Sequence, residues 1–231
     1  MPLEISEELK LVTSKFSPYG HRVEITLIEK SLPYEKEDVN LADKPEWFKK
    51  NAPLGQAPLL HSDNNILFDS TAICEYLEDA FPKHPLHVEN TVNKSQHRAW
   101  MVYSDVILNA IFGVMFAKDS AQFKIKKADL ITKLDQLETH LDNNDQLNPY
   151  FGGEIFTLAD VFFLATLKPL TYIDNKFTLE ILKNHKHIQT YITHLMSRTS
   201  LKKVMPANYE ELFISFLKKK NSHLLTLSFS L

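Results

Sequence analysis

The chain has 231 residues, of which 44% are hydrophobic, 24% are charged and 5 are glycines, a composition that excludes collagen-like and low-complexity disordered proteins. The 26 Lys and Arg residues against 29 Asp and Glu residues leave a formal net charge of -3. This balance gives no basic surface for nucleic acid, and we predict that the protein binds none.

The cysteine count and the N-terminal segment indicate the cellular compartment in which the protein is expected. Cys74 is the single cysteine, which excludes an internal disulfide and is typical of a reducing compartment. The segment from Met1 to Lys10 has three glutamates and no continuous apolar stretch, unlike a signal peptide. No window has the roughly 20 uninterrupted apolar residues that a membrane span requires. We therefore expect a cytoplasmic protein without a membrane partner.

The first part of the chain alternates strand and helix patterns. Leu9–Thr13 is predicted to be a strand, and the apolar residues from Val23 to Ile28 suit a helix with one buried side. Tyr34–Leu41 reads as a second strand, and a short helix is expected around Glu46–Lys50. The order strand, helix, strand predicts an α/β domain.

A hairpin and a capped helix complete this domain. The segments Pro58–His61 and Ile66–Phe68 flank the turn signal Asp63–Asn65, which predicts an antiparallel pair of strands. Asp69–Ser70 then supplies an N-cap for a helix that ends before Pro82.

The remainder is expected to be helical. We predict a first domain at residues 1–83, a linker at 84–90 and an all-α bundle at 91–231. Thr157 and Asp160 have the spacing of a helix-capping box, which favours a structural role for the Asp160 carboxylate. The longest helical patterns are Val92–Ala117, Ile125–Leu141, Leu158–Leu170 and Ile188–Met196.

No metal site is predicted. The pairs His84/His87 and His185/His187 lack neighbouring cysteines and the histidine spacing of zinc motifs. Cys74 lies in an apolar helical stripe, where a thiol is expected to be a small and unreactive core residue.

Several stretches resemble the omega-like cytosolic glutathione transferases in order and spacing. In the first domain these are Phe16–Tyr19, Asn40–Asn51, Gly55–Leu60 and Asp69–Leu77, and in the second they are Gly152–Gly153 and Thr157–Asp160. The resemblance implies the glutathione transferase fold, an α/β thioredoxin-like N-terminal domain followed by an all-α helical-bundle C-terminal domain. It also implies a homodimer that takes glutathione as co-substrate and a small hydrophobic electrophile as acceptor.

The resemblance places glutathione in the first domain. Ala57 would present its main-chain N–H and C=O to the peptide-like ligand as an added antiparallel strand. The resemblance implies a cis peptide bond before Pro58, a contact of Lys44 with the glycyl carboxylate, and Tyr19 lining the site. Without it, Pro58 would be a trans turn proline and Lys44 an exposed loop lysine.

Asp69 and Ser70 begin a predicted helix, where free N–H groups and the helix dipole favour an anion. Ser70 would hold the γ-glutamyl carboxylate, and Asp69 would accept the neighbouring ammonium. The residues alone favour an ordinary helix cap, and only the flanking resemblance favours a ligand site.

Ser17 is the candidate catalytic residue, because its hydroxyl can stabilise the thiolate of bound glutathione by a hydrogen bond. Tyr19 and Ser14 are alternative hydroxyl donors. The omega pattern has a cysteine where this chain has Ser17, and an alcohol forms no mixed disulfide with glutathione.

These residues favour a glutathione S-transferase that activates the thiol for attack on small electrophiles. One alternative is a non-catalytic binding protein of the same fold, similar to stringent starvation proteins. The other is an omega-type glutathione-dependent reductase, which would need the cysteine that Ser17 replaces.

Overall fold

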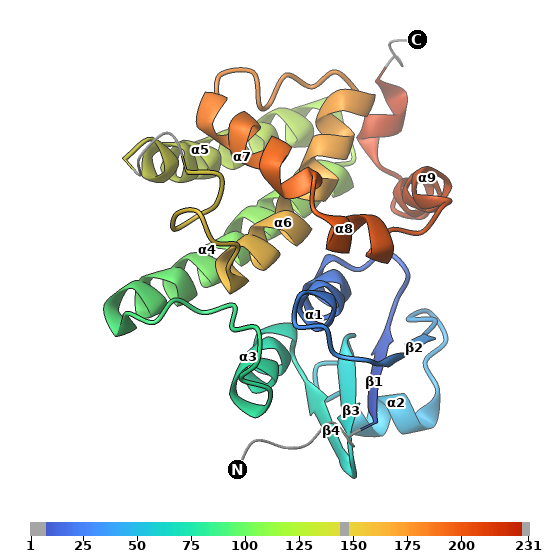
Figure 1. The fold of residues 1–231 in the computed structure, drawn as a ribbon. Coiled ribbons are helices and arrows are strands. Elements are labelled where there is room, and N and C mark those ends of the chain that lie inside the picture. Colours follow the sequence, from blue (N-terminus) through green and yellow to red (C-terminus); the bar gives the residue numbers. More distant parts are fainter. Residues whose placement is uncertain (1–7, 144–147, 228–231) are drawn as a thin grey trace. The chain divides into compact units, whose positions relative to one another are not determined.

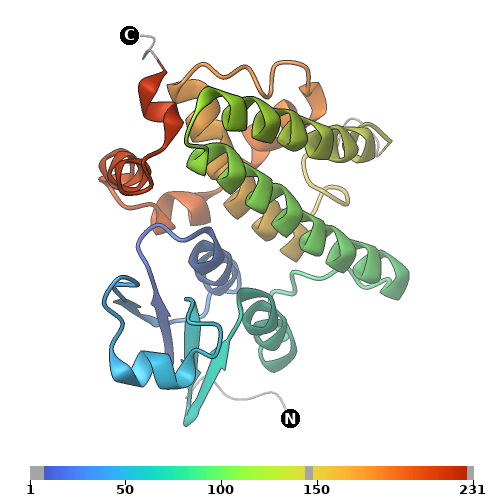
Figure 2. The same cartoon turned by 180° about the vertical axis from the view of Figure 1, so that it is seen from behind.

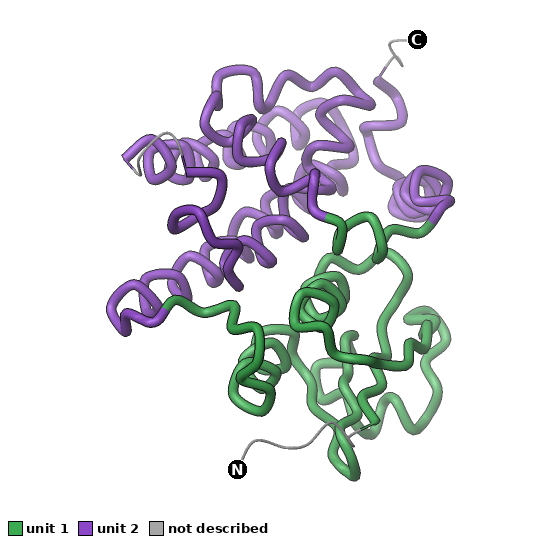
Figure 3. The backbone as a smooth tube through the Cα atoms, viewed as in Figure 1, with its two compact units in different colours: residues 1–88, 199–206 green, residues 89–198, 207–231 purple. Residues whose placement is uncertain are grey.

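A computed structural model describes residues 8–143 and 148–227 (Figure 1). The chain divides into two compact units (Figure 3). The first holds the described residues up to Val88 together with Thr199–Pro206, and the second holds Glu89–Arg198 and the described residues from Ala207 onward. The bundle predicted at 91–231 therefore lacks one segment, which packs with the first unit instead.

A four-stranded sheet in the order β2-β1-β3-β4 forms the centre of the first unit. Its strands are β1 Leu9–Thr13, β2 Glu35–Asp38, β3 Leu59–Ser62 and β4 Asn65–Phe68. β1 runs parallel to β2 and antiparallel to β3, and β3 and β4 form the predicted hairpin. Because Leu59 pairs with both Val12 and Phe68, β1 and β4 finish at the end of the sheet where β3 starts. We call this end the loop end of the sheet.

Helices cover both faces of this sheet (Figures 1 and 2). They are α1 Pro18–Glu29, α2 Glu46–Asn51 and α3 Ser70–Ala80. The first unit also contains α8 Thr199–Val204. α1 and α3 pack against each other on one face. On the other face α2 buries Phe48 in an apolar cluster that includes Val12 and Leu59. This α/β arrangement confirms the architecture predicted for the first part of the chain.

α8 joins the first unit because it packs on α1. Leu201 and Val204 are buried, and the Ser200 hydroxyl donates a hydrogen bond to the Glu29 carboxylate at the end of α1. These two residues are 171 positions apart in the sequence. A six-residue helix gives too short a pattern to predict, and a contact over such a separation leaves no local signal.

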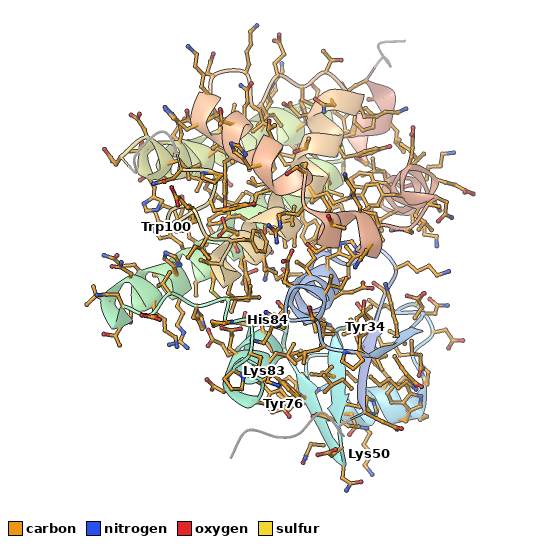
Figure 4. The ribbon with its side chains drawn as sticks, in the orientation of Figure 1. Tyr34, Lys50, Tyr76, Lys83, His84 and Trp100 are labelled. Atoms are coloured by element: carbon orange, nitrogen blue, oxygen red, sulfur yellow. The ribbon has the colours of Figure 1, made fainter. Side chains whose placement is uncertain are left out.

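A buried ion pair ties the end of the first unit to its helices. Lys30 Nζ lies 2.6 Å from Glu78 Oε1, and both side chains are almost completely buried. Lys30 also donates to the main-chain carbonyl of His84, which is labelled in Figure 4. The second oxygen of Glu78 accepts the N–H groups of Leu86 and His87. Much of the predicted linker at 84–90 is therefore fixed to α1 and α3.

The second unit is built from helices. They are α4 Thr91–Phe116, α5 Ser120–Asn143, α6 Leu158–Lys176, α7 Lys186–Met196, α9 Tyr209–Lys219 and the 3-10 helix η1 His223–Thr226. α6 contacts α4 and α7 and buries most of its residues, as expected of the central helix of a bundle. It continues beyond its predicted end at Leu170 because Pro169 is accommodated inside the helix.

α4 has the length and composition of a membrane-spanning helix, with a mean hydropathy of 1.6 over 18 residues. Core helices meet the same criteria. α4 packs against α5 and α6, with Ile107, Leu108 and Ile111 completely buried. Packing inside the second unit therefore accounts for part of its apolar character, and 44% of the apolar window is buried.

Asp160 caps α6, as its spacing from Thr157 predicts. Its Oδ2 accepts the Thr157 N–H at 2.8 Å and the Thr157 hydroxyl at 2.7 Å. Its Oδ1 accepts the Phe151 N–H at 2.8 Å and the Tyr191 hydroxyl at 2.7 Å. The ring of Phe151 continues into an aromatic cluster with Trp100, which Figure 4 labels. Asp160 is fully buried, and both of its oxygens serve the fold.

Candidate functional site

Ser17 is the N-cap of α1. Its extended backbone ends the loop after β1, and Pro18 occupies the first turn, where its missing N–H costs no hydrogen bond. Ser17 Oγ accepts the Gly20 N–H at 3.3 Å. Since the hydroxyl acts as an acceptor in this contact, its proton remains available for an anion. Ser17 is partly exposed, so a ligand can reach it.

Gly20 holds the loop close to the sheet, a feature that the sequence analysis did not identify. A Cβ at Gly20 would lie 1.8 Å from Thr13 Oγ1 at the end of β1. Any larger residue would push the first turn of α1 away from β1. Gly20 therefore sets the position of Ser17, and it is one of only five glycines in the chain.

Tyr19 follows in the first turn of α1. The guanidinium of Arg22 lies 5.0 Å from the centre of its ring, within the range of a cation–π contact. Arg22 is completely buried. The Tyr19 ring thus packs against a buried guanidinium. This contact favours a packing role for Tyr19 beside the site.

Ala57 and Pro58 precede β3 and are joined by a cis peptide bond, as the resemblance implies. The hydrogen-bonded ladder with β4 begins at Leu59. Ala57 therefore lies just beyond the paired part of the sheet, where an extended ligand can add to it.

Asp69 and Ser70 follow β4 and start α3. Asp69 Oδ1 accepts the N–H groups of Thr71 at 2.9 Å and Ala72 at 3.0 Å. Within the described part of the chain, Asp69 Oδ2 makes no hydrogen bond or ion pair. The φ of Asp69 is 71°, a left-handed value that is rare for a residue with a side chain and that clusters at ligand sites.

Lys44 lies over the loop that leads to Ala57. Its Nζ is 3.5 Å from the position of a Cβ at Gly55, whose φ of 62° suits glycine. Lys44 is partly exposed and forms no ion pair with any described residue. No local sequence pattern connects Lys44 with Gly55, because both lie in an irregular loop without a repeating spacing.

The strand register brings most of these residues to the loop end of the sheet. Ser17 follows the end of β1, Ala57–Pro58 precedes the start of β3, and Asp69–Ser70 follows the end of β4. Lys44 joins them through its position over Gly55. Hydroxyl, main-chain, carboxylate and ammonium groups thus gather within the first unit.

Cys74 lies elsewhere in the same unit and is fully buried. Burial raises the pKa of its thiol to about 12, although a contact with the Thr26 hydroxyl at 3.4 Å acts in the opposite direction. A thiol of this kind is protonated and unreactive at neutral pH. The described residues contain no group of three or more His, Cys, Asp or Glu side chains placed to hold a metal ion.

Family models match both parts of the chain. A model described as "Glutathione S-transferase, N-terminal domain" matches residues 11–85, and one described as "Glutathione S-transferase, C-terminal domain" matches residues 104–206. Together they cover well over half of the sequence.

Relatives with three different names align with the chain. Pyrimidodiazepine synthase of Drosophila melanogaster is 31% identical over 66% of this chain and 60% of its own length. Glutathione S-transferase DHAR3 of Arabidopsis thaliana is 29% identical over 86% of this chain and 74% of its own length. A stringent starvation protein A homolog of Haemophilus influenzae is 28% identical over 83% of this chain and 87% of its own length. The chain thus spans only about three fifths of the Drosophila protein.

Solved structures share the fold. A tau class glutathione S-transferase from mango, Mangifera indica, superposes with a TM-score of 0.82 at 22% identity, over 92% of this chain and 98% of its own. A glutathione S-transferase from Methylobacillus flagellatus, solved with GSH bound, gives a TM-score of 0.74 at 26% identity, over 87% of this chain and 100% of its own.

Proposed function

Because the chain belongs to the glutathione S-transferase family, we propose that it binds reduced glutathione at the loop end of the sheet and activates its thiol for attack on small electrophiles. The observation that carries this proposal is the register of β1, β3 and β4, which gathers the candidate groups at one end of the sheet. The GSH-bound structure with the same fold supports it.

The polar groups of this site complement glutathione, which has two carboxylates, an ammonium and a thiol. Asp69 Oδ2 accepts the ammonium, and Lys44 pairs with the glycyl carboxylate. Asp69 Oδ1 already satisfies the N–H groups of Thr71 and Ala72, so the γ-glutamyl carboxylate takes its hydrogen bonds from Ser70. The main chain of Ala57 extends the sheet to the ligand.

Ser17 is proposed to activate the thiol. A free thiol has a pKa of about 8.5, and lowering it by about two units takes about 2.7 kcal/mol. A hydrogen bond from a hydroxyl to an anion contributes about 1.5–3 kcal/mol. The N-terminus of α1 adds about 0.3–1 kcal/mol, so Ser17 and the helix together contribute about 1.8–4 kcal/mol, a range that includes the required value. Tyr19, whose ring packs on Arg22, is assigned to binding.

A non-catalytic binding protein is the second candidate, because the stringent starvation protein A homolog aligns over most of both chains. The thiol-transfer chemistry of a reductase is less suited to this chain. Ser17 forms no disulfide, and Cys74 is buried with a raised pKa.

We also propose a cytoplasmic homodimer. Exposed valines on α4, among them Val92 and Val102, support a partner on that helix. Sedimentation at micromolar concentration as two chains is the expected result, and sedimentation as one chain contradicts it.

Calorimetric titration with reduced glutathione tests the binding site. We expect saturable binding that Lys44→Ala and Ser70→Ala weaken by about tenfold or more, as loss of a charged hydrogen bond predicts. Lys50→Ala is the matched control, since Lys50 is exposed on α2 (Figure 4) and outside the proposed site. No binding by the wild-type protein, or equal binding by all variants, contradicts the proposal.

A further inference from the structure

A lysine in the second unit lies among aromatic rings. Lys168, on α6, places its Nζ 2.9 Å from the centre of the Tyr209 ring at the start of α9. Tyr209 meets Tyr172 edge-on, with ring centroids 5.6 Å apart, and Tyr172 lies one turn after Lys168. The ring of Phe213 is 4.5 Å from Tyr172 and 5.7 Å from Tyr209. We call these four residues the Lys168 cluster.

The acidic residue beside this cluster already forms an ion pair with another lysine. Glu210 pairs with Lys176, two turns further along α6, at 2.6 Å. Lys168 makes neither an ion pair nor a hydrogen bond with any residue that the structure describes. The Tyr172 hydroxyl is buried and also has no hydrogen-bond partner in the described part of the chain. No carboxylate of the described residues therefore pairs with the ammonium of Lys168.

This environment favours the neutral amine. Burial lowers the pKa of Lys168 to about 7, although the face of the Tyr209 ring attracts cations and acts against this change. Burial also raises the pKa of Tyr172 to about 12, with Glu210 contributing, so the neighbouring phenols are neutral as well. The Lys168 side chain remains partly exposed and can be reached from solution.

We propose that Lys168 is a nucleophilic amine that forms imines with small aromatic aldehydes. Its neutral nitrogen attacks the carbonyl carbon and forms a C–N bond. The carbonyl oxygen then takes both protons of the amine and leaves as water, and a C=N bond remains. No oxidant or reductant takes part. The partly exposed rings of Tyr172 and Tyr209 provide an apolar surface for the ring of the aldehyde, and Phe213 is completely buried against them. A desolvated lysine is the usual residue for this chemistry.

The fraction of each lysine that is neutral at a given pH sets how selectively the aldehyde labels Lys168. An ordinary lysine with a pKa of about 10.4 is neutral in less than about 0.1% of molecules at pH 7, whereas an amine with a pKa near 7 is about half neutral. Lys176 is the matched control, because it lies on the same helix and its amine pairs with Glu210 at 2.6 Å.

Reductive labelling of the intact protein tests the proposal. Benzaldehyde and sodium borohydride are added at a series of pH values, and peptide mass spectrometry gives the rate at each lysine. We expect Lys168 to be labelled at least about tenfold faster than Lys176 at pH 7, with a rate that levels off above about pH 8. A rate no higher than that of Lys176, or one that still rises at pH 10, overturns the proposal.

Two variants separate reactivity from accessibility. Lys168→Arg replaces the amine with a guanidinium, which stays protonated, and should abolish the label on that peptide. Tyr209→Ala exposes the amine to water, so the ratio of Lys168 labelling at pH 7 to that at pH 10 should fall severalfold, and the rate at pH 7 should fall with it. Circular dichroism verifies the fold of each variant. A folded Tyr209→Ala protein that labels as fast as the wild type at pH 7 overturns the proposal. No glutathione is added, so the outcome is independent of the function proposed above.

Discussion

Two aspartates cap helices in this protein, and their surroundings differ. Asp160 at the start of α6 is fully buried, and its two oxygens accept four hydrogen bonds from the fold. Asp69 at the start of α3 is exposed and uses one oxygen to cap the helix. Its backbone is held at a positive φ, whereas the α6 cap residue Thr157 has ordinary extended geometry.

The comparison shows when a capping carboxylate can also bind a ligand. Burial raises the pKa of Asp160, and the donors around it act in the opposite direction. With every lone-pair direction taken and no exposure, Asp160 has nothing to offer a ligand. Asp69 has a free oxygen, solvent access and neighbours at the loop end of the sheet. We therefore expect mutation of Asp160 to lower stability and mutation of Asp69 to weaken ligand binding.

The largest effect is expected for Asp160→Ala. It leaves the buried N–H and hydroxyl donors of Phe151, Thr157 and Tyr191 without an acceptor, which should lower the free energy of unfolding by about 3 kcal/mol or more. Urea denaturation measures this change. Asp129→Ala is the control, because Asp129 forms an exposed pair with Lys133 that is worth less than about 1 kcal/mol. A loss of less than about 1 kcal/mol in Asp160→Ala would show that the network is unimportant for stability.

A smaller effect is expected at Asp69. Asp69→Asn keeps a good helix cap and removes the charge, so stability should change by less than about 0.5 kcal/mol. Loss of the contact with the ammonium should weaken glutathione binding by about 2 kcal/mol, or about thirtyfold. Calorimetry and urea denaturation of the same preparation measure both quantities. Wild-type affinity in Asp69→Asn would assign Asp69 to capping alone.

Local patterns predicted much of this structure. The Asp160 cap, the Asp63–Asn65 turn and the long helices of the second unit all follow from residues close together in the sequence. The end of α6 was predicted too early, because packing tolerates Pro169 inside the helix.

Features that depend on distant residues were not predicted. α8 packs on α1 across most of the chain length, and α9 and η1 had no recognised pattern. At the site, the types of the candidate residues were readable, but their meeting at one end of the sheet depends on strand register. The contact of Gly20 with Thr13 and the positive φ of Asp69 are tertiary features. The Lys168 cluster likewise joins two helices that are separate in the sequence.

The most direct test of the account is the pKa of the thiol of bound glutathione. The ultraviolet absorbance of the thiolate is followed against pH at saturating glutathione in the wild-type and Ser17→Ala proteins. We expect a wild-type pKa below the free value of about 8.5 and a rise of about one unit in Ser17→Ala, because the hydroxyl donor at the N-cap of α1 is lost. An identical thiol pKa in the two proteins would contradict the role assigned to Ser17.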